Sequence, residues 1–428
     1  MKKLFAFFLA FALFCLSACN IAPPAGTSGN GGVQGTPNTP SGENWQDAVK
    51  DRIVSSSLSH LIDLPSRVIF GNPAGSRTYY YSKVDGKAYD YCFDPLCDHT
   101  DYTCLANPGG LFASFETGWT FNSTFFINGR FYSTTMFGQI WSFAFDGSDK
   151  RIEYDAGYDL EEIFQNGPRT NIWSTPAIVY GPYIYINVEQ IVHGDPHILR
   201  FNVETKEMED LTEKTGNFIY PHYFYNGMIY GNGDYAKTGD AFLKADLDLR
   251  TVEVQETAFY ADAYAGTVLV GPVYKERESI EEIPEQIGLF FYDIKTGEQK
   301  VLTKEELGLE DYPFLVGATD EHFYFYIPTI VNIGTVINNQ GKEWTVQKMN
   351  DGKLYRMDSD GTNIVCVYED PDYELNYNMV ISEDRILMTG KYITIEDGQK
   401  KTWGGMIQVA VINEDGTVGE FKEVEYVS

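Results

Sequence analysis

Basic residues are scarce in this sequence. Its 428 residues include 32 Lys and Arg against 61 Asp and Glu, which gives a formal net charge of −29 at pH 7. A surface of this charge repels nucleic acid phosphates and anionic lipid headgroups. The composition therefore argues against a nucleic acid partner and against a basic membrane-binding surface.

The sequence also lacks the common short catalytic motifs. It contains no Gly-Xaa-Ser-Xaa-Gly nucleophile elbow, no phosphate-binding glycine-rich loop and no His-Glu-Xaa-Xaa-His metalloprotease pair. The carboxylate pair of a glycosidase cannot be recognised among 61 acids without geometry. A long helical pattern is missing too, whereas 30 Tyr and 28 Phe suit strands that bury one face.

One strand–turn–strand unit recurs along the chain. In its clearest copy, residues 290–303, aromatic and β-branched residues flank a turn in which Asp293 caps the backbone and Gly297 takes the positive φ. Similar hairpins begin at Tyr80, Ser142, Leu199, Leu243, Leu354 and Val409. Seven such units at a spacing of roughly 45 to 65 residues predict an array of sheet blades.

Most of these outer hairpins follow an inner pair of apolar strands with a turn of its own. Asn128-Gly129 and Asn226-Gly227 mark such turns, because Asn-Gly suits a type I′ hairpin. Four strands per repeat predict an all-β fold, a β-propeller of four-stranded antiparallel blades, with seven blades favoured and six or eight as alternatives. A solenoid has shorter repeats, and a stacked sandwich does not need seven similar hairpins. We expect a single propeller domain over residues 45–428.

The N-terminus has the features of a bacterial export signal. Lys2 and Lys3 precede an apolar run from Leu4 to Leu16, which is short for a transmembrane anchor. Leu-Ser-Ala-Cys at positions 16–19 resembles the lipobox of bacterial lipoproteins, which implies a signal peptide over 1–18 and a lipid-modified Cys19. An ordinary signal peptide with a chance cysteine is the alternative. Loss of residues 1–18 leaves 30 basic against 61 acidic side chains, a net charge of −31.

Residues 19–44 are predicted to be a linker. Beyond the cysteine they are rich in Gly, Pro, Ser, Thr and Asn and nearly devoid of large apolar side chains. Such a segment cannot bury enough surface to offset its ordering entropy. We therefore expect an extracytoplasmic protein that is anchored to the cell membrane through Cys19 by way of a flexible spacer.

Three cysteines and one histidine are concentrated after the outer strand of the first repeat. Cys92, Cys97, His99 and Cys104 have the spacing Cys-Xaa4-Cys-Xaa-His-Xaa4-Cys. Three thiolates and an imidazole are an acceptable tetrahedral set for a structural zinc ion. A disulfide between two of the cysteines, as in many exported proteins, and three unpaired thiols are the alternatives. A catalytic Cys–His pair is not favoured, because no orienting partner can be named.

In general layout the repeats resemble propellers of the TolB and YWTD type, although the Tyr-Trp-Thr-Asp motif itself is absent. Together with the lipobox and the Cys/His segment, the chain is similar to largely uncharacterised β-propeller lipoproteins of anaerobic Firmicutes. This resemblance covers nearly the whole chain after the signal peptide. It implies the fold and the anchor but no particular ligand.

The lengths of the connections differ between the two faces of the predicted propeller. In blades with strands A to D, the A–B and C–D turns lie on one face, and the B–C loops and the D-to-A crossovers lie on the other. The first kind is short here, whereas the B–C loops are long and dissimilar, at 189–197, 234–242, 275–286, 327–351 and 395–405. We expect ligands to bind on the face with the long loops, and the alternative is that these are merely tolerated insertions.

A few other residues have two interpretations. Cys366 is expected to be a small buried hydrophobe of a strand. Residues 358–363 are expected to form a repeat turn, with a calcium loop as the alternative. His193 and His197 fall in a predicted loop, where a metal site with Asp195 is less favoured than a solvated loop. Four tryptophans near predicted loops or strand ends could stack on sugars, although packing is the commoner role of such rings; they are Trp119, Trp173, Trp344 and Trp403.

The leading functional hypothesis is a non-enzymatic, lipid-anchored binding module for a protein, peptide or glycan. The alternatives are a carbohydrate-active hydrolase or lyase with acids at the channel mouth, and a structural lipoprotein of an envelope assembly. No cofactor is expected beyond the zinc ion considered above, and the chain is expected to be a monomer.

Overall fold

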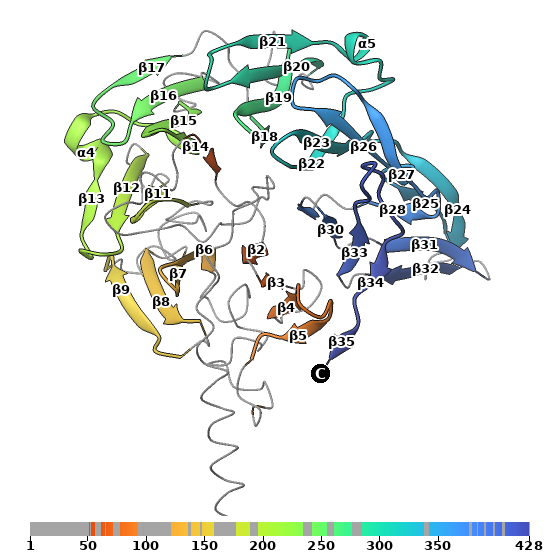
Figure 1. Cartoon of the computed structure of the whole chain (residues 1–428), viewed down its shortest axis with the longest axis horizontal. Coiled ribbons are helices and arrows are strands. Elements are labelled where there is room, and N and C mark those ends of the chain that lie inside the picture. The colour runs from red at the N-terminus through yellow and green to blue at the C-terminus, as the bar shows by residue number, and fades with distance from the viewer. Residues whose placement is uncertain are drawn as a thin grey trace, which may run out of the picture. The chain divides into compact units, whose positions relative to one another are not determined.

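The chain folds into a ring of seven four-stranded antiparallel blades (Figure 1). The computed structural model describes residues 51, 53–55, 61–64, 66–71, 78–92, 97, 121–135, 138–145, 148–157, 177–188, 196–233, 242–254, 261–275, 285–337, 342–375, 379–382, 384–388, 391–396, 399–404 and 407–427. The fold is an all-β, seven-bladed β-propeller, which confirms the predicted class and the favoured number of blades.

The blades follow one another in chain order. Blade 1 contains β2 (Leu61–Leu64), β3 (Arg67–Gly71), β4 (Thr78–Ser82) and β5 (Ala88–Asp90). Blade 2 contains β6 (Phe121–Ile127), β7 (Arg130–Thr135), β8 (Gln139–Ala144) and β9 (Arg151–Asp155). Blade 3 contains β10 (Ile178–Tyr180), β11 (Tyr183–Val188), β12 (His197–Asn202) and β13 (Met208–Asp210). Blade 4 contains β14 (Tyr220–Tyr225), β15 (Met228–Asn232), β16 (Phe242–Asp246) and β17 (Val252–Val254).

The last three blades include two with insertions. Blade 5 contains β18 (Ala263–Ala265), β19 (Val268–Tyr274), β20 (Gln286–Asp293) and β21 (Gln299–Leu302). Blade 6 contains β22 (Phe314–Ala318), β23 (His322–Tyr326), β26 (Lys353–Asp358) and β27 (Val365–Glu369). Blade 7 contains β29 (Met379–Ile381), β30 (Arg385–Met388), β33 (Gln408–Val411) and β34 (Lys422–Glu423).

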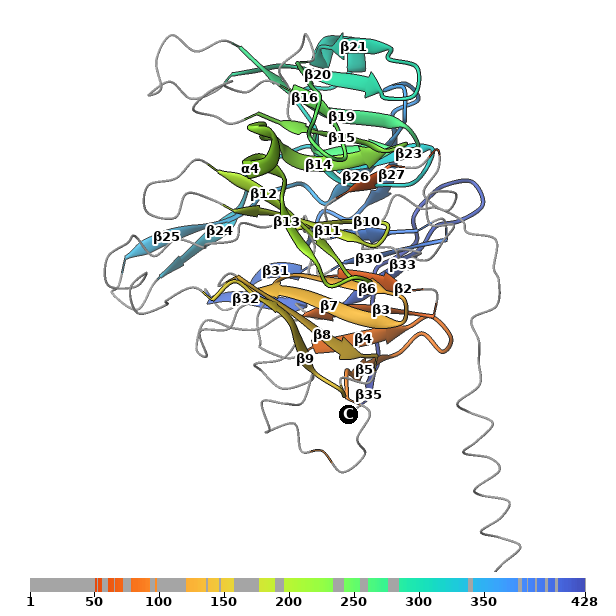
Figure 2. The same cartoon turned by 90° about the vertical axis from the view of Figure 1, so that its left-hand side faces the viewer.

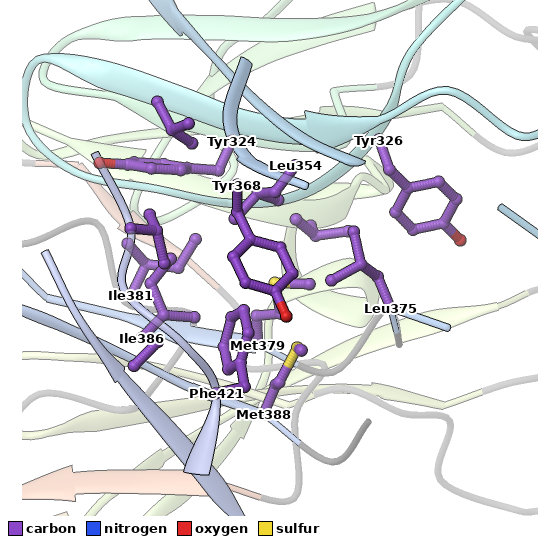
Figure 3. Packing of buried hydrophobic residues seen from close by; sticks show 14 of the residues in the cluster. Tyr324, Tyr326, Leu354, Tyr368, Leu375, Met379, Ile381, Ile386, Met388 and Phe421 are labelled. Atoms are coloured by element: carbon purple, nitrogen blue, oxygen red, sulfur yellow. The ribbon is translucent and has the colours of Figure 1, made fainter. Parts of the chain in front are cut away.

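Seven apolar clusters hold the ring together, and each lies between two neighbouring blades. The cluster between blades 6 and 7 includes Tyr324, Ile381 and Phe421, whose packing Figure 3 shows. Val68 and Val380 belong to the cluster that joins blade 1 to blade 7. Since burial of one large apolar side chain contributes about 1.5–3 kcal/mol, these interfaces are the main source of stability of the ring.

Two short terminal strands extend two of the sheets. At the C-terminus, β35 (Tyr426–Val427) pairs in parallel with β5 of blade 1 and so links the two ends of the ring. Near the N-terminus, β1 (Val54–Ser55) pairs antiparallel with β14, the innermost strand of blade 4. In Figure 1 it is the dark red strand beside β14, on the inner side of that blade.

The recurring hairpins of the sequence are the two outer strands of each blade. The turn between β20 and β21 shows why the motif recurs, because Asp293 accepts hydrogen bonds from Lys295 N and from the Thr296 hydroxyl, and Gly297 has φ 79°. The A–B turns of blades 1 to 5 have two residues each. The pair Leu64↔Arg67 identifies the inner hairpin of blade 1, which the sequence did not make clear.

Two short helices lie in D-to-A crossovers. Helix α4 (Leu211–Thr215) is capped by Asp210, and α5 (Lys304–Leu307) by Thr303 and Glu306 in a capping box. Each buries one leucine, Leu211 or Leu307. Within the described part of the chain, no helix is long and apolar enough to cross a membrane.

The long loops predicted in blades 6 and 7 contain strands. Blade 6 carries the hairpin β24 (Val331–Ile337) and β25 (Glu343–Lys348) between its strands B and C. Blade 7 carries β31 (Lys391–Glu396) and β32 (Gln399–Gly404) at the equivalent place, and β31 also pairs with β28 (Tyr373–Glu374) of the preceding crossover. The prediction that the B–C connections of blades 6 and 7 are loops was wrong. Each forms a β-hairpin of its own, which is not one of the four strands of the blade.

Candidate functional site: the variable face

The two faces of the propeller differ as the loop lengths predicted. We call the face with the A–B and C–D turns the turn face, and the face with the B–C loops and the D-to-A crossovers the variable face. On the variable face, the connections between strands B and C range from three residues in blade 2 to the 26 residues between β23 and β26. The added strands β24, β25, β31 and β32 arise from such connections, and β28 arises from the D-to-A crossover between blades 6 and 7.

The insertions of blades 6 and 7 form one structure, here called the insertion platform (β24, β25, β28, β31 and β32). Strand β24 packs against β31 and β32, and β28 joins β31 through the pairs Tyr373↔Tyr392 and Glu374↔Lys391. Figure 2 shows β24 and β25 extending beyond the blades on one side, with β31 and β32 nearby.

Buried polar contacts fix the base of the platform. The side chain of Lys348 is only 2% exposed, and its ammonium group donates a hydrogen bond to the Pro371 carbonyl oxygen. Asn350 is fully buried, and its amide donates to Leu375 O at 2.9 Å and accepts from Leu375 N at 3.1 Å. Because a buried donor or acceptor that loses its partner costs about 1–3 kcal/mol, these bonds hold the hairpin in one position.

The platform exposes large apolar side chains. Ile337 is 70% exposed and Trp344 64%, and both lie toward the free end of the β24–β25 hairpin. Ile330 and Met349, at the base of the same hairpin, are also exposed. Because Trp344 pairs with Val336 and Ile337 with Glu343, and neighbours along a strand alternate in direction, the two side chains project from opposite faces of the hairpin. Each face of the free end therefore presents one large apolar side chain to solvent.

A second group of residues lies at the inner strands of blades 4 and 5. His222 of β14 and Asp262, just before β18, each stand four positions before the first residue of the A–B turn of their blade. They therefore occupy equivalent places near the variable face. The Tyr223 hydroxyl donates to Ala261 O at 2.9 Å and joins the two inner strands at this level.

The protein environment shifts the pKa of both groups. Burial lowers the pKa of His222 to about 4, although a hydrogen bond with Asn232 opposes that shift, so this imidazole is neutral near pH 7. Burial likewise raises the pKa of Asp262 to about 6. Asp262 is nevertheless exposed to solvent over part of its surface.

The backbone is adapted to this arrangement at His222. The register of β14 shifts between Pro221 and Tyr223, so His222 lies in a β-bulge. The facing Gly231 has no space for a side chain, since a Cβ atom there would lie 1.8 Å from Tyr220 O. The position of His222 thus depends on a glycine in the next strand.

The predicted Cys/His segment is described only in part. Cys92 and Cys97 are half-buried, and Cys92 follows β5 at its variable-face end, as expected for a D-to-A crossover. His99 and Cys104 lie outside the described residues, so the choice between zinc and a disulfide stays a prediction. The predicted signal peptide, Cys19 and the linker also lie outside them.

Other predicted sites have structural explanations. In the turn at 358–363, Asp358 accepts from the Asn363 amide at 2.6 Å and Asp360 from Thr362 N at 2.9 Å. These bonds support the turn interpretation, and no cluster of three metal-ligating side chains occurs among the described residues. His197 begins β12 and contacts Asp210 at 2.7 Å, whereas His193 is not described.

Cys366 is exposed on β27, and the prediction that it is buried was wrong. It lies on the fourth strand of its blade, which forms the outer edge of the sheet, and its thiol donates to Tyr368 O at 3.2 Å. The sequence alone did not single out His222 and Asp262. The one signal in the sequence that relates the two residues is their position, because each precedes the A–B turn of its repeat by four residues.

No protein-family model and no curated protein matches the sequence. Among solved structures, the extracellular domain of a one-component system from B. thetaiotaomicron matches with a TM-score of 0.36 and 11% identity over 78% of this chain, which spans only 37% of that chain. The β-propeller domain of the Trilobed protease from Pyrococcus furiosus matches with a TM-score of 0.40 and 12% identity, over 74% of this chain and 88% of that one. An oligogalacturonate lyase from Vibrio parahaemolyticus matches with a TM-score of 0.40 and 10% identity, over 86% of this chain and 93% of that one.

These similar proteins include enzymes and a protein of another kind, so the likeness concerns architecture and not activity. The chain has the fold of a seven-bladed β-propeller.

Proposed function

We propose that this chain is an extracytoplasmic, lipid-anchored propeller that binds a protein, peptide or glycan through its variable face. The observation that carries this proposal is the insertion platform on the variable face, whose braced hairpin exposes Trp344 on one of its faces and Ile337 on the other. Tryptophan is among the residues that contribute most to protein interfaces. The exposed Ile337 on the other face of the hairpin favours a protein or peptide over a glycan.

A binding screen with matched variants tests the role of the platform. Peptide and glycan arrays are probed with the wild-type chain, Trp344→Ala and Ile337→Ala, and with Val254→Ala as the control. Val254 is 65% exposed on the outer strand β17, away from the platform. We expect specific array signals to fall at least tenfold in the Trp344 variant and to persist in the control. Equal signals from all four proteins would show that the platform is not the binding surface.

The anchor belongs to the same proposal. A signal peptide over 1–18, lipid on Cys19 and a linker over 19–44 would place the propeller outside the cell, as in the Firmicutes propeller lipoproteins that the chain resembles. Cys19→Ala is expected to release the protein from the membrane fraction or to block its maturation. Normal processing with full membrane retention in that variant would refute the anchor. A structural role in an envelope assembly would show instead as stable copurification of other envelope proteins.

The Cys/His segment would serve as a staple of the first crossover. Cys92, Cys97, His99 and Cys104 would hold a structural zinc ion, and a disulfide among the cysteines is the alternative. Native and denaturing mass spectrometry of the unreduced protein separates the two, because zinc adds the mass of one ion and a disulfide removes two hydrogens. Three thiols without metal would refute both.

A carbohydrate-active enzyme is the second candidate, and Asp262 is the observation that favours it. Burial raises the pKa of its carboxyl, as a general acid requires. Hydrolysis of glycosides usually needs two carboxyl groups, and His222 is the titratable residue at the equivalent position of blade 4. Cleavage of oligosaccharides by the wild-type chain, lost in Asp262→Asn, would establish this function instead of simple binding.

A further inference from the structure

The N-terminal strand β1 lies inside the ring. It pairs with the inner edge of β14 through Val54↔Phe224 and Ser55↔Tyr223, and it also packs against β10 of blade 3. In the other blades, the described chain places no strand on the inner side of strand A. The segment therefore runs along the axial side of blade 4.

The direction of this segment follows from its contacts. Asp51 N donates to the Asn226 side chain at 2.8 Å, and the Asn226 amide donates to the Asp51 carboxylate at 3.1 Å. Asn226 is in the β14–β15 turn, so Asp51 lies at the turn face. From there β1 runs antiparallel to β14, toward the variable face, where Leu61 begins β2.

The packing of β1 keeps it in this place. Ile53 and Val54 are each only 7% exposed. Ile53 belongs to the apolar cluster between blades 4 and 5, and Val54 to the one between blades 3 and 4. Two buried aliphatic side chains on opposite sides of β14 thus fix the point at which the chain enters the ring.

We infer that the chain leaves the propeller through the turn face, so that an N-terminal anchor directs the variable face away from the membrane. This inference rests on the lipid anchor proposed above. It specifies the kind of partner, which is a macromolecule that approaches from the side opposite the anchoring membrane. A partner embedded in the same membrane would instead meet the turn face.

The length of the predicted spacer supports this orientation. The spacer predicted over residues 19–44 has 26 residues, and a flexible segment of that length has a root-mean-square length of about 28 Å. A compact body of about 380 residues has a radius of about 27 Å. If the propeller turned its variable face toward the membrane, the spacer would have to run around half of its circumference, a path of about 85 Å. Full extension of the spacer reaches only about 90 Å, and the reversed orientation is therefore rare.

Energy transfer to labelled lipids tests the orientation. The mature chain carries a polyhistidine tag in place of Cys19. It is bound to phosphatidylcholine vesicles that contain a nickel-chelating lipid and a lipid with a fluorescent energy acceptor on its headgroup. A donor is attached through azidophenylalanine at Lys295 in the β20–β21 turn, or at Glu343 near the end of the β24–β25 hairpin. Both positions are exposed. We expect at least twofold higher transfer efficiency from position 295, and equal or reversed efficiencies would overturn the inference.

Two controls connect the result to β1. When the tag is moved to the C-terminus, which β35 directs toward the variable face, the difference should vanish or reverse. In Val54→Asp, which places a charge in the apolar cluster, the difference should shrink while the circular dichroism spectrum stays that of the wild type. A difference that persists with the C-terminal tag would refute the inference even if Val54→Asp unfolds.

The vesicle assay supplies its own anchor. Its outcome therefore does not depend on whether Cys19 is lipidated, and the Cys19→Ala fractionation separately tests the proposed anchor.

Discussion

Arg200 of β12 joins two blades with a single side chain. Its guanidinium contacts Glu209 of the same blade at 2.5 Å and Asp248 of blade 4 at 2.8 Å, and it donates to Leu247 O at 3.0 Å. It also lies over the ring of Tyr183, 4.9 Å from the centroid. Only 13% of the side chain is exposed, so solvent screens these interactions weakly.

Arg200→Lys is expected to lower the free energy of unfolding by about 1–3 kcal/mol, because one ammonium group cannot reproduce the forked contacts to two blades. Urea denaturation measures the change. The control is Arg250→Lys, since Arg250 also pairs with Asp248, at 3.1 Å, but its side chain is 77% exposed. That variant should change stability by less than about 0.5 kcal/mol, as for exposed ion pairs. Equal effects of the two substitutions would show that Arg200 is not a bridge between blades.

The Asp262 carboxyl predicts a pH dependence of stability. Burial raises its pKa from 3.8 to about 6, so between these values the folded chain binds a proton that the unfolded chain has released. The free energy of unfolding therefore decreases as the pH rises through this window. Asp262→Asn should leave the melting temperature unchanged at pH 4 and raise it at pH 7.

The matched control for this prediction is Glu253→Gln, which neutralises an exposed carboxyl on the outer strand β17. It should alter the melting temperature by less than Asp262→Asn at pH 7. A gain for Asp262→Asn that is the same at pH 4 and pH 7 would mean that the carboxyl is not the cause.

At the scale of elements, the insertion platform is separable from the ring. Residues 333–346 can be replaced by Asn-Gly, because Asn332 and Gln347 are register partners whose side chains are joined at 2.9 Å. Since most of the removed side chains are exposed or half-exposed, we expect the melting temperature to fall by less than about 1.5 °C, which corresponds to about 1 kcal/mol for a domain of this size. Differential scanning calorimetry measures it. A loss of cooperative unfolding would show that the hairpin belongs to the core.

The same elements show what could be predicted from the sequence. The outer hairpins were recognised because Asp and Gly are required locally, as at Asp293 and Gly297. The β24–β25 hairpin was missed, although Val331, Ile333 and Thr335 follow a strand-like alternation, because its length suggested a loop. No local signal could reveal β1, whose partners Tyr223 and Phe224 lie far along the chain. Likewise, no local signal shows that His222 and Asp262 occupy equivalent positions, because this depends on the register of the inner hairpins of blades 4 and 5.

At the scale of the whole molecule, the ring closes through the C-terminus. Besides the β35–β5 pairing, Glu425 O accepts from Ala88 N at 2.9 Å, and the Glu425 carboxylate pairs with Lys87 at 2.8 Å. The Tyr426 ring packs edge-on against Tyr79, with centroids 5.5 Å apart. These contacts join blade 1 to the segment that follows blade 7.

Truncation after Val424 is expected to lower the free energy of unfolding by about 1–3 kcal/mol, because it removes a strand pairing and an aromatic contact at once. Urea denaturation provides the measurement. Lys87→Met, which removes only the ion pair, should cost less than about 1 kcal/mol. If the truncated chain is as stable as the wild type, the apolar cluster between blades 7 and 1 closes the ring without β35.

The path of β1 also determines how the molecule bears mechanical load. A pull on the N-terminus enters beside Asn226, near the hub and not at the rim. Because β1 runs along β14, such a pull shears the hydrogen bonds between the two strands together instead of opening them one by one. Ile53 and Val54 pass the force to the interfaces on both sides of blade 4. Tension applied through the N-terminus, as by the proposed anchor, would thus load the ring at its centre and be shared by three blades.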